Sequence, residues 1–176
     1  MPKSAKKLRS NPAWIERHIN DPFVKKSKAE GYRARSAYKL LELNEKEKLF
    51  RPGITVVDLG SAPGSWTQVA RSKMVNAAGK FSGHLVAMDI LPMEPVPDAV
   101  FLQGDFREQE VADQLSALLA DGKVDVVLSD MAPNLSGIPA VDAAASLLLN
   151  ELALEFALEH LCENGVLVVK AFQGSG

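Results

Sequence analysis

The sequence predicts an α/β fold: a doubly wound, mostly parallel sheet of the Rossmann-like type, preceded by a small helical extension. Five short apolar runs alternate with helical patterns after residue 51, which is typical of a parallel sheet covered by helices on both faces. A Gly/Pro-rich loop, "GSAPGS", follows the first run, where such sheets bind ligands. The 176 residues are 47% hydrophobic and 24% charged, which suits one globular domain with a core.

The first fifty residues are predicted to form the extension. A basic arm is followed by short helical patterns, which we expect at about 13–19, at 22–30 and from residue 36 onward. The tripeptide "RPG" at 51–53 then breaks the chain. We therefore divide the chain into a basic, partly helical extension over 1–50, expected to bind a polyanion, and an α/β domain over 51–176.

The α/β domain is predicted element by element from its apolar pattern. Strands are expected at 54–59, 83–90, 99–105, 124–130 and 165–172, and helices at 66–75, 108–120 and 143–161. The last helical pattern has Glu151, Glu155 and Glu159 on one solvated face and extends to the single cysteine, Cys162. An apolar fifth strand would lie at or near a sheet edge, so we interpret the sequence as a fragment of a longer protein.

Charge is strongly segregated along the chain. Residues 1–39 hold 11 Lys/Arg and 3 Asp/Glu, whereas the rest holds 9 Lys/Arg and 19 Asp/Glu. This pattern favours a polyanionic partner at the amino end, although a solvated basic tail is the alternative. One cysteine and three scattered histidines predict no disulfide and no metal site, and no apolar run is long enough to span a membrane. We expect a cytoplasmic monomer.

Aspartates stand at the ends of the first four predicted strands: Asp58, Asp89, Asp105 and Asp130. Carboxylates repel a pyrophosphate and suit a cationic cofactor such as S-adenosylmethionine, while the aspartate after the second strand can accept from ribose hydroxyls. A dinucleotide site is less favoured, since Ala62 stands at the third position of the G-x-G-x-x-G pattern. The alternative is that each aspartate caps the helix that follows it.

Several motifs together indicate a family. The segments "VVDLGSAPGSW", "AMDILPM", "FLQGDFRE", "LSDMAPNLSG" and "VVKAFQG" occur in this order, and with the "SAYKLLEL" segment they resemble the RlmE/FtsJ (RrmJ) family. The resemblance implies S-adenosylmethionine-dependent 2′-O-methylation of a uridine ribose in large-subunit ribosomal RNA. The ribosomal RNA in the large subunit would be the partner.

The resemblance also implies site residues. The family's catalytic set is Lys-Asp-Lys-Glu, and its first three members fall on Lys39, Asp130 and Lys170, while the glutamate would lie beyond residue 176. The glycine-rich loop and the family motifs together predict cofactor-binding residues, namely Gly60, Gly64, Trp66, Asp89, Asp105 and Asp130.

The chemistry explains this choice of residues. A ribose 2′-hydroxyl must lose its proton while its oxygen is aligned with the methyl group, and we assign Lys170 as the base. Lys39 would supply a neighbouring cation and Asp130 would orient the amine. Aromatic residues in the extension (Trp14, Phe23, Tyr32 and Tyr38) could stack on bases or pack the small helices. Two other functions stay open: a cofactor- and RNA-binding fragment with little turnover, and an NAD-dependent oxidoreductase.

Overall fold

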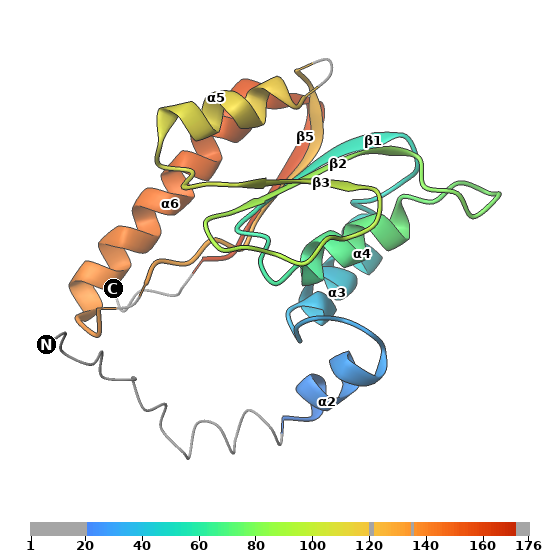
Figure 1. Ribbon diagram of the computed structural model, residues 1–176, viewed down its shortest axis with the longest axis horizontal. Helices are drawn as coiled ribbons and strands as arrows, with labels where there is room; N and C mark the ends of the chain where they lie inside the picture. Colours follow the sequence, from blue (N-terminus) through green and yellow to red (C-terminus); the bar gives the residue numbers. More distant parts are fainter. Residues whose placement is uncertain (1–20, 120–121, 135, 172–176) are drawn as a thin grey trace, which may run out of the picture.

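The computed structural model describes residues 21–119, 122–134 and 136–171. One parallel sheet forms the middle layer, with α5 and α6 on one face and α3 and α4 on the other, while α2 lies below α3 (Figure 1). The elements in chain order are α2 Pro22–Ala29, α3 Ala37–Glu47, β1 Ile54–Leu59, α4 Ser65–Lys73, β2 Gly83–Asp89, β3 Ala99–Gln103, α5 Gln109–Ala117, β4 Val124–Ser129, α6 Pro139–His160 and β5 Leu161–Val169.

The sheet has the strand order β3-β2-β1-β4-β5, and all its described pairs are parallel. This arrangement confirms the doubly wound α/β fold class, and it places β5 at an edge as expected. The strand order reverses at β1, where the chain first moves to β2 and β3 and later returns to β4. Such a switch point brings the loops after β1 and β4 together at the carboxyl edge.

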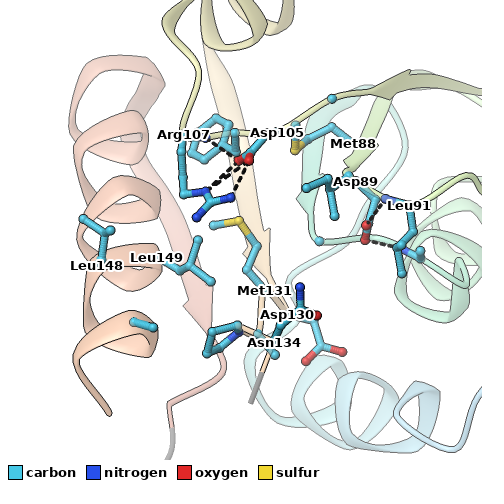
Figure 2. Close-up of a pocket in the computed structure, with 18 residues that line it drawn as sticks. Met88, Asp89, Leu91, Asp105, Arg107, Asp130, Met131, Asn134, Leu148 and Leu149 are labelled. Carbon is cyan, nitrogen blue, oxygen red and sulfur yellow. Dashed lines mark hydrogen bonds and ion pairs between the residues drawn. The ribbon is translucent and has the colours of Figure 1, made fainter. Parts of the chain in front are cut away.

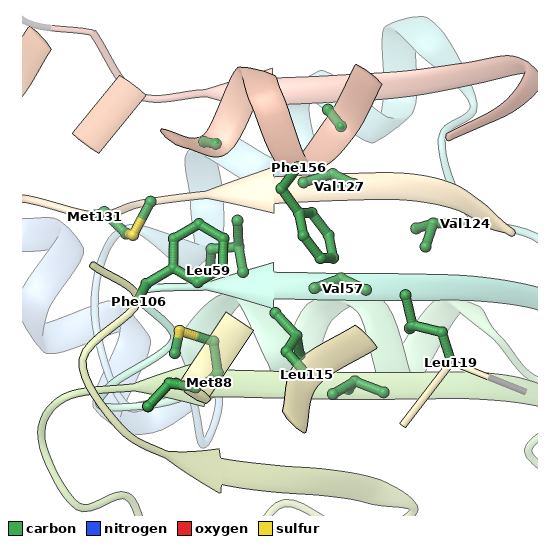
Figure 3. Close-up of a cluster of buried hydrophobic side chains, with 14 residues drawn as sticks. Val57, Leu59, Met88, Phe106, Leu115, Leu119, Val124, Val127, Met131 and Phe156 are labelled. Atoms are coloured by element: carbon green, nitrogen blue, oxygen red, sulfur yellow. The ribbon is translucent and has the colours of Figure 1, made fainter. Parts of the chain in front are cut away.

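Alternate residues of the strands feed two apolar clusters, because successive side chains point to opposite faces. Val57 and Leu59 of β1 pack beneath α5 and α6 with Leu115 and Phe156 (Figure 3). Val56 faces the opposite side and joins the cluster formed with α3 and α4. The three central strands, β1, β2 and β4, are largely buried on both faces, which explains why their sequences read as continuous apolar runs.

The extension is attached to the second of these clusters. Asp21 caps the start of α2, and its carboxylate accepts a hydrogen bond from the Phe23 N–H at 2.8 Å. α3 buries Ala37 and Leu40 against the α/β domain. The predicted basic arm and the helix at 13–19 lie outside the described residues.

Two predicted boundaries near the carboxyl end were wrong. α6 begins at Pro139 rather than at 143, because proline suits the first turn of a helix and the Asp142 carboxylate accepts hydrogen bonds from the N–H groups of Ser136 and Gly137. The helix ends at His160, and Cys162 belongs to β5 rather than to the helix. β5 starts early because Leu161 pairs with Val124 of β4, a contact that a local helical pattern does not reveal.

Candidate functional site

A pocket of about 510 Å³ lies at the carboxyl ends of β1, β2, β3 and β4 and extends to α6. Figure 2 shows Asp105 and Arg107 at one end, Leu148 and Leu149 on the α6 side, and Asp130 at the opposite end. The lining residues are Gly60, Ala62, Met88, Asp89, Ile90, Leu91, Gly104, Asp105, Phe106, Arg107, Asp130, Met131, Ala132, Pro133, Asn134, Ala145, Leu148 and Leu149. The volume is in the range of small-molecule sites, and acidic groups are set in a largely apolar wall.

Gly60 allows the loop after β1 to lie close to the loop after β4, the neighbouring strand in the sheet. Gly60 has a φ of +73°, and a Cβ atom there would lie 2.8 Å from the backbone of Met131. Its N–H and that of Ser61 both donate to the Met88 carbonyl, at 2.9 and 3.0 Å. The glycine therefore allows the loops after β1 and β4 to meet at the pocket.

Asp89 joins the loop after β1 to the end of β2. One carboxylate oxygen accepts from the Ala62 N–H and the other from the Leu91 N–H, both at 2.8 Å. Its side chain is buried but lines the pocket. Because a carboxylate can accept about four hydrogen bonds, Asp89 keeps acceptor capacity for hydroxyl groups of a ligand.

Asp105 forms a local ion pair with Arg107. The Arg107 Nη2 atom lies 2.6 Å from one carboxylate oxygen, and the guanidinium Nε also donates to the group. The hydrogen bonds from Arg107 lower the pKa of Asp105 and keep it ionised. Sequence reasoning did not single out Arg107 as a pocket residue, although its position two residues after an aspartate in "GDFRE" was a usable signal.

Asp58 is fully buried within β1. Its Oδ2 accepts a hydrogen bond from the Thr67 hydroxyl at 2.6 Å, while its Oδ1 has no hydrogen-bond partner in the described part of the chain. The pKa of Asp58 is raised to about 7, chiefly by burial; the hydrogen bond from Thr67 opposes the rise, and the negative charges of Asp130 and Asp89 add to it. The strand-end aspartates thus differ, because Asp58 lies beneath the pocket and does not line it.

Asp130 and Lys170 form an ion pair at the carboxyl ends of two neighbouring strands. The Lys170 Nζ atom lies 2.6 Å from the Asp130 Oδ1 and also donates to the Asp130 carbonyl at 3.3 Å. Backbone hydrogen bonds continue the ladder at this point: Asp130 N–H donates to Leu59, and Lys170 N–H donates to Ser129. The sheet therefore fixes the amine beside a carboxylate that lines the pocket.

Lys39 lies on the first turn of α3, and its side chain is exposed. The pKa of Glu42 is lowered mainly by the hydrogen bond from Lys46, and the positive charge of Lys39 adds a smaller effect in the same direction. The approach of Lys39 to the Asp130–Lys170 pair stays a prediction.

Gly64 and Trp66 do not line the pocket. The buried Trp66 indole donates a hydrogen bond to the Ser36 carbonyl at 3.0 Å and so joins α4 to the start of α3. Gly64 has a φ of +106°, and a Cβ atom there would lie 2.6 Å from the Arg33 guanidinium. In this structure both residues face the extension, while Gly60, Asp89, Asp105 and Asp130 line one pocket.

The pocket suits a cationic ligand rich in hydroxyl groups. Asp89, Asp105 and Asp130 offer only acceptors when ionised, and the surrounding Met88 and Leu149 side chains offer an apolar surface for a flat ring. A pyrophosphate would face three carboxylates and a single arginine that is already paired. The residues present therefore fit S-adenosylmethionine better than a dinucleotide.

Comparison with known proteins agrees with this geometry. The family model of the FtsJ-like methyltransferases matches residues 32–176. The chain belongs to this family. The family resemblance predicted from the motifs is confirmed, and the protein is a methyltransferase.

The relatives extend beyond this chain. A Bordetella pertussis protein named ribosomal RNA large subunit methyltransferase E is 57% identical over 93% of this chain and 78% of its own length. The protein of the same name from Paraburkholderia phytofirmans is 53% identical over 97% of this chain and 80% of its own.

Solved structures show the same fold. A Plasmodium falciparum protein described as a ribosomal RNA methyltransferase has a TM-score of 0.71 and 30% identity, over 82% of this chain and 80% of its own. The MycE methyltransferase of mycinamycin biosynthesis, at 13% identity and a TM-score of 0.52 over 93% of this chain and 48% of its own, shares the fold alone.

Two further properties concern metals and membranes. Within residues 21–119, 122–134 and 136–171, no group of three His, Cys, Asp or Glu side chains is placed to hold a metal ion. The helices of the same described ranges are too short or too polar to cross a bilayer.

Proposed function

We propose that this methyltransferase transfers the methyl group of S-adenosylmethionine to the 2′-hydroxyl of a uridine in large-subunit ribosomal RNA. The observation that carries the proposal is the Asp130–Lys170 pair, 2.6 Å apart at the rim of an acidic pocket. The names of the relatives support ribosomal RNA as the substrate. The choice of the ribose 2′-hydroxyl of uridine follows from the family resemblance of the motifs.

Different pocket residues would contact different parts of the cofactor. Asp89 would accept from the ribose hydroxyls, Asp105 would face the base, and Asp130 would face the cationic end of the cofactor. When bound, S-adenosylmethionine supplies an electrophilic methyl group on its sulfonium. The apolar residues around the pocket, among them Met131 and Leu149, exclude water from the site.

The paired residues would handle the proton of the target hydroxyl. The Lys170 amine, in its neutral form, accepts the 2′-hydroxyl proton at Nζ as the oxygen attacks, and Asp130 holds Nζ in place. Lys39 would add a second positive charge beside the reacting groups. Alignment of the oxygen by these groups supplies much of the rate.

The extension offers the surface for RNA. Lys25 and Lys28 are exposed on α2, and their charges suit phosphate contacts that position RNA without reading its sequence. Phe23 is 55% exposed, so it is available for stacking on a base. Tyr38 instead packs between Phe23 and Tyr32, with ring centroids 5.8 and 5.9 Å away. We place the protein in the cytoplasm as a monomer that acts on the large subunit.

A substitution of the base tests the reaction. Lys170→Met keeps an unbranched side chain but removes the amine, so we expect transfer of tritiated methyl groups to undermethylated large subunits to fall by at least about 100-fold. The affinity for S-adenosylmethionine, measured by calorimetry, should change only a few fold. Lys73→Met, an exposed lysine in the last turn of α4, is the matched control. Transfer at the wild-type rate by Lys170→Met would remove Lys170 from the role of base.

The second candidate function is a cofactor- and RNA-binding fragment with little turnover. The observation that favours it is the length of the relatives, of which this chain covers 78–80%. The wild-type chain would then bind S-adenosylmethionine and large subunits but transfer no methyl groups. Methyl transfer by this chain, located at a ribose by nuclease digestion and mass spectrometry, would decide for the enzyme.

A further inference from the structure

We infer that Arg33 is a positioning residue that holds together the two loops at the mouth of the cofactor pocket. The inference rests on the proposed function, since the pocket is taken to bind S-adenosylmethionine. Arg33 lies in the short connection between α2 and α3, within the basic extension and outside the pocket wall. Its role would link the segment that meets RNA to the site that binds the cofactor.

The Arg33 guanidinium bridges two separate loops. Its Nη1 donates to the Pro63 carbonyl at 3.0 Å, in the loop after β1, and to the Glu94 carbonyl at 2.6 Å, in the loop after β2. Its Nη2 donates to the Pro95 carbonyl at 2.8 Å. A planar group with several fixed donors can join carbonyls from two segments in this way, whereas a lysine ammonium is a point donor.

The same two loops carry residues of the pocket. The loop after β1 contributes Gly60 and Ala62, and the segment at the end of β2 contributes Asp89. Inside the pocket they are joined by the hydrogen bond from the Ala62 N–H to the Asp89 carboxylate. Arg33 supplies the corresponding connection outside the pocket, so its loss would leave the carboxylate and the loop less well aligned.

The backbone around Arg33 is itself anchored to α4. The Gln68 side-chain oxygen accepts from the Arg33 N–H, and the Gln68 amide group donates to the Gly31 carbonyl, both at 3.0 Å. Gly64 leaves the space that the guanidinium occupies, because a Cβ atom there would lie 2.6 Å from Nη1. Arg33 therefore has a defined place in the fold, unlike an arginine that is held only by solvent.

Arg35 offers a matched control two residues away. It carries the same charge in the same basic segment, but its side chain is exposed and pairs with Asp21 at the surface. If Arg33 served only to contact RNA phosphates, Arg33→Gln and Arg35→Gln would both weaken RNA binding and leave the free protein unchanged. If Arg33 positions the loops, only its substitution changes the cofactor site in the absence of RNA.

The experiment measures two properties of the RNA-free protein. For Arg33→Gln we expect the dissociation constant for S-adenosylmethionine to rise about tenfold, because charge-assisted hydrogen bonds are lost, and for Arg35→Gln we expect a change within about twofold. In the absence of any ligand, amide hydrogen exchange should quicken in 60–64 and 89–96 for Arg33→Gln alone, while exchange in β1 and β4 stays unchanged. Arg33→Lys should give an intermediate affinity.

The outcomes separate this inference from the proposed function. The wild-type protein could fail to bind S-adenosylmethionine while amide exchange in the two loops quickens only in Arg33→Gln. That result would support the positioning role of Arg33 and refute the proposal that S-adenosylmethionine is the cofactor. Alternatively, the wild-type protein could bind S-adenosylmethionine, and Arg33→Gln and Arg35→Gln could show the same affinity and the same amide exchange. That result would refute the positioning role of Arg33 and leave the proposed function intact. If Arg33→Gln fails to fold, Arg33→Lys decides: unchanged affinity and exchange in that variant would overturn the inference.

Discussion

The buried Asp58 should make the stability of the fold depend on pH in a particular direction. Its pKa is raised to about 7 from an ordinary value of 3.8, chiefly by burial. Between these two values the unfolded chain releases the proton while the folded protein retains it. The folded state then binds more protons than the unfolded state, so its stability falls as the pH rises through this window.

The size of the effect follows from the shift. About three pKa units at about 1.4 kcal/mol each give an upper limit of about 4 kcal/mol, and we expect a measured contribution of about 2–4 kcal/mol. Asp58→Asn removes the titrating group and keeps an oxygen that accepts from the Thr67 hydroxyl. Between about pH 4 and about pH 8, the unfolding free energy of the variant should therefore fall by about 2–4 kcal/mol less than that of the wild type.

Urea unfolding of both proteins across this pH range measures the difference. Other groups also titrate, so the relevant quantity is the difference between the wild-type and variant slopes of unfolding free energy against pH. Asp113→Asn, at an exposed site on α5, is the control and should follow the wild-type slope. Parallel curves for wild type and Asp58→Asn would refute the argument that burial holds this carboxyl group protonated.

Two further predictions concern the pocket. Gly60→Ala should lower the unfolding free energy by about 2–5 kcal/mol in urea titrations, because a steric clash with Met131 adds to the strain of a positive φ. Gly79→Ala is the control: its φ is also positive, at +72°, but the space around it is open, so the loss should be only about 1–2 kcal/mol. Equal losses would contradict the packing argument. Asp105→Asn should weaken S-adenosylmethionine binding by about tenfold in calorimetry, since Arg107 would then face a cationic ligand unpaired, and unchanged affinity would argue against this assignment.

The sequence was sufficient for the sheet and for the acidic pocket because these depend on local patterns. Continuous apolar runs marked the five strands, and their carboxyl ends meet at one edge of a parallel sheet. The juxtaposition of Asp130 and Lys170 was therefore predictable from two residues that directly follow β4 and β5. The family motifs supplied the chemical roles.

Features that depend on distant contacts were not predictable in the same way. The loop motif predicts cofactor contacts for Trp66 and Gly64, and that role stays a prediction. It does not reveal that Trp66 donates to Ser36, 30 residues earlier in the chain, or that Gly64 makes room for Arg33. The early start of β5 at Leu161 likewise depends on pairing with β4. The hydrophobic periodicity of one segment does not show which distant segment will contact it.

The irregular pairing of β5 lies at the start of the strand, away from the Asp130–Lys170 pair that follows its end. Between two successive pairs, Val124↔Leu161 and Val126↔Val166, the edge strand has three more residues than its neighbour, and beyond them the register runs without interruption to Ser129↔Val169. Insertions or deletions among residues 162–165 would alter the size of this excursion. The distance between the Lys170 amine and the Asp130 carboxylate should stay the same, because the register from Val166 to Val169 does not depend on the length of this segment.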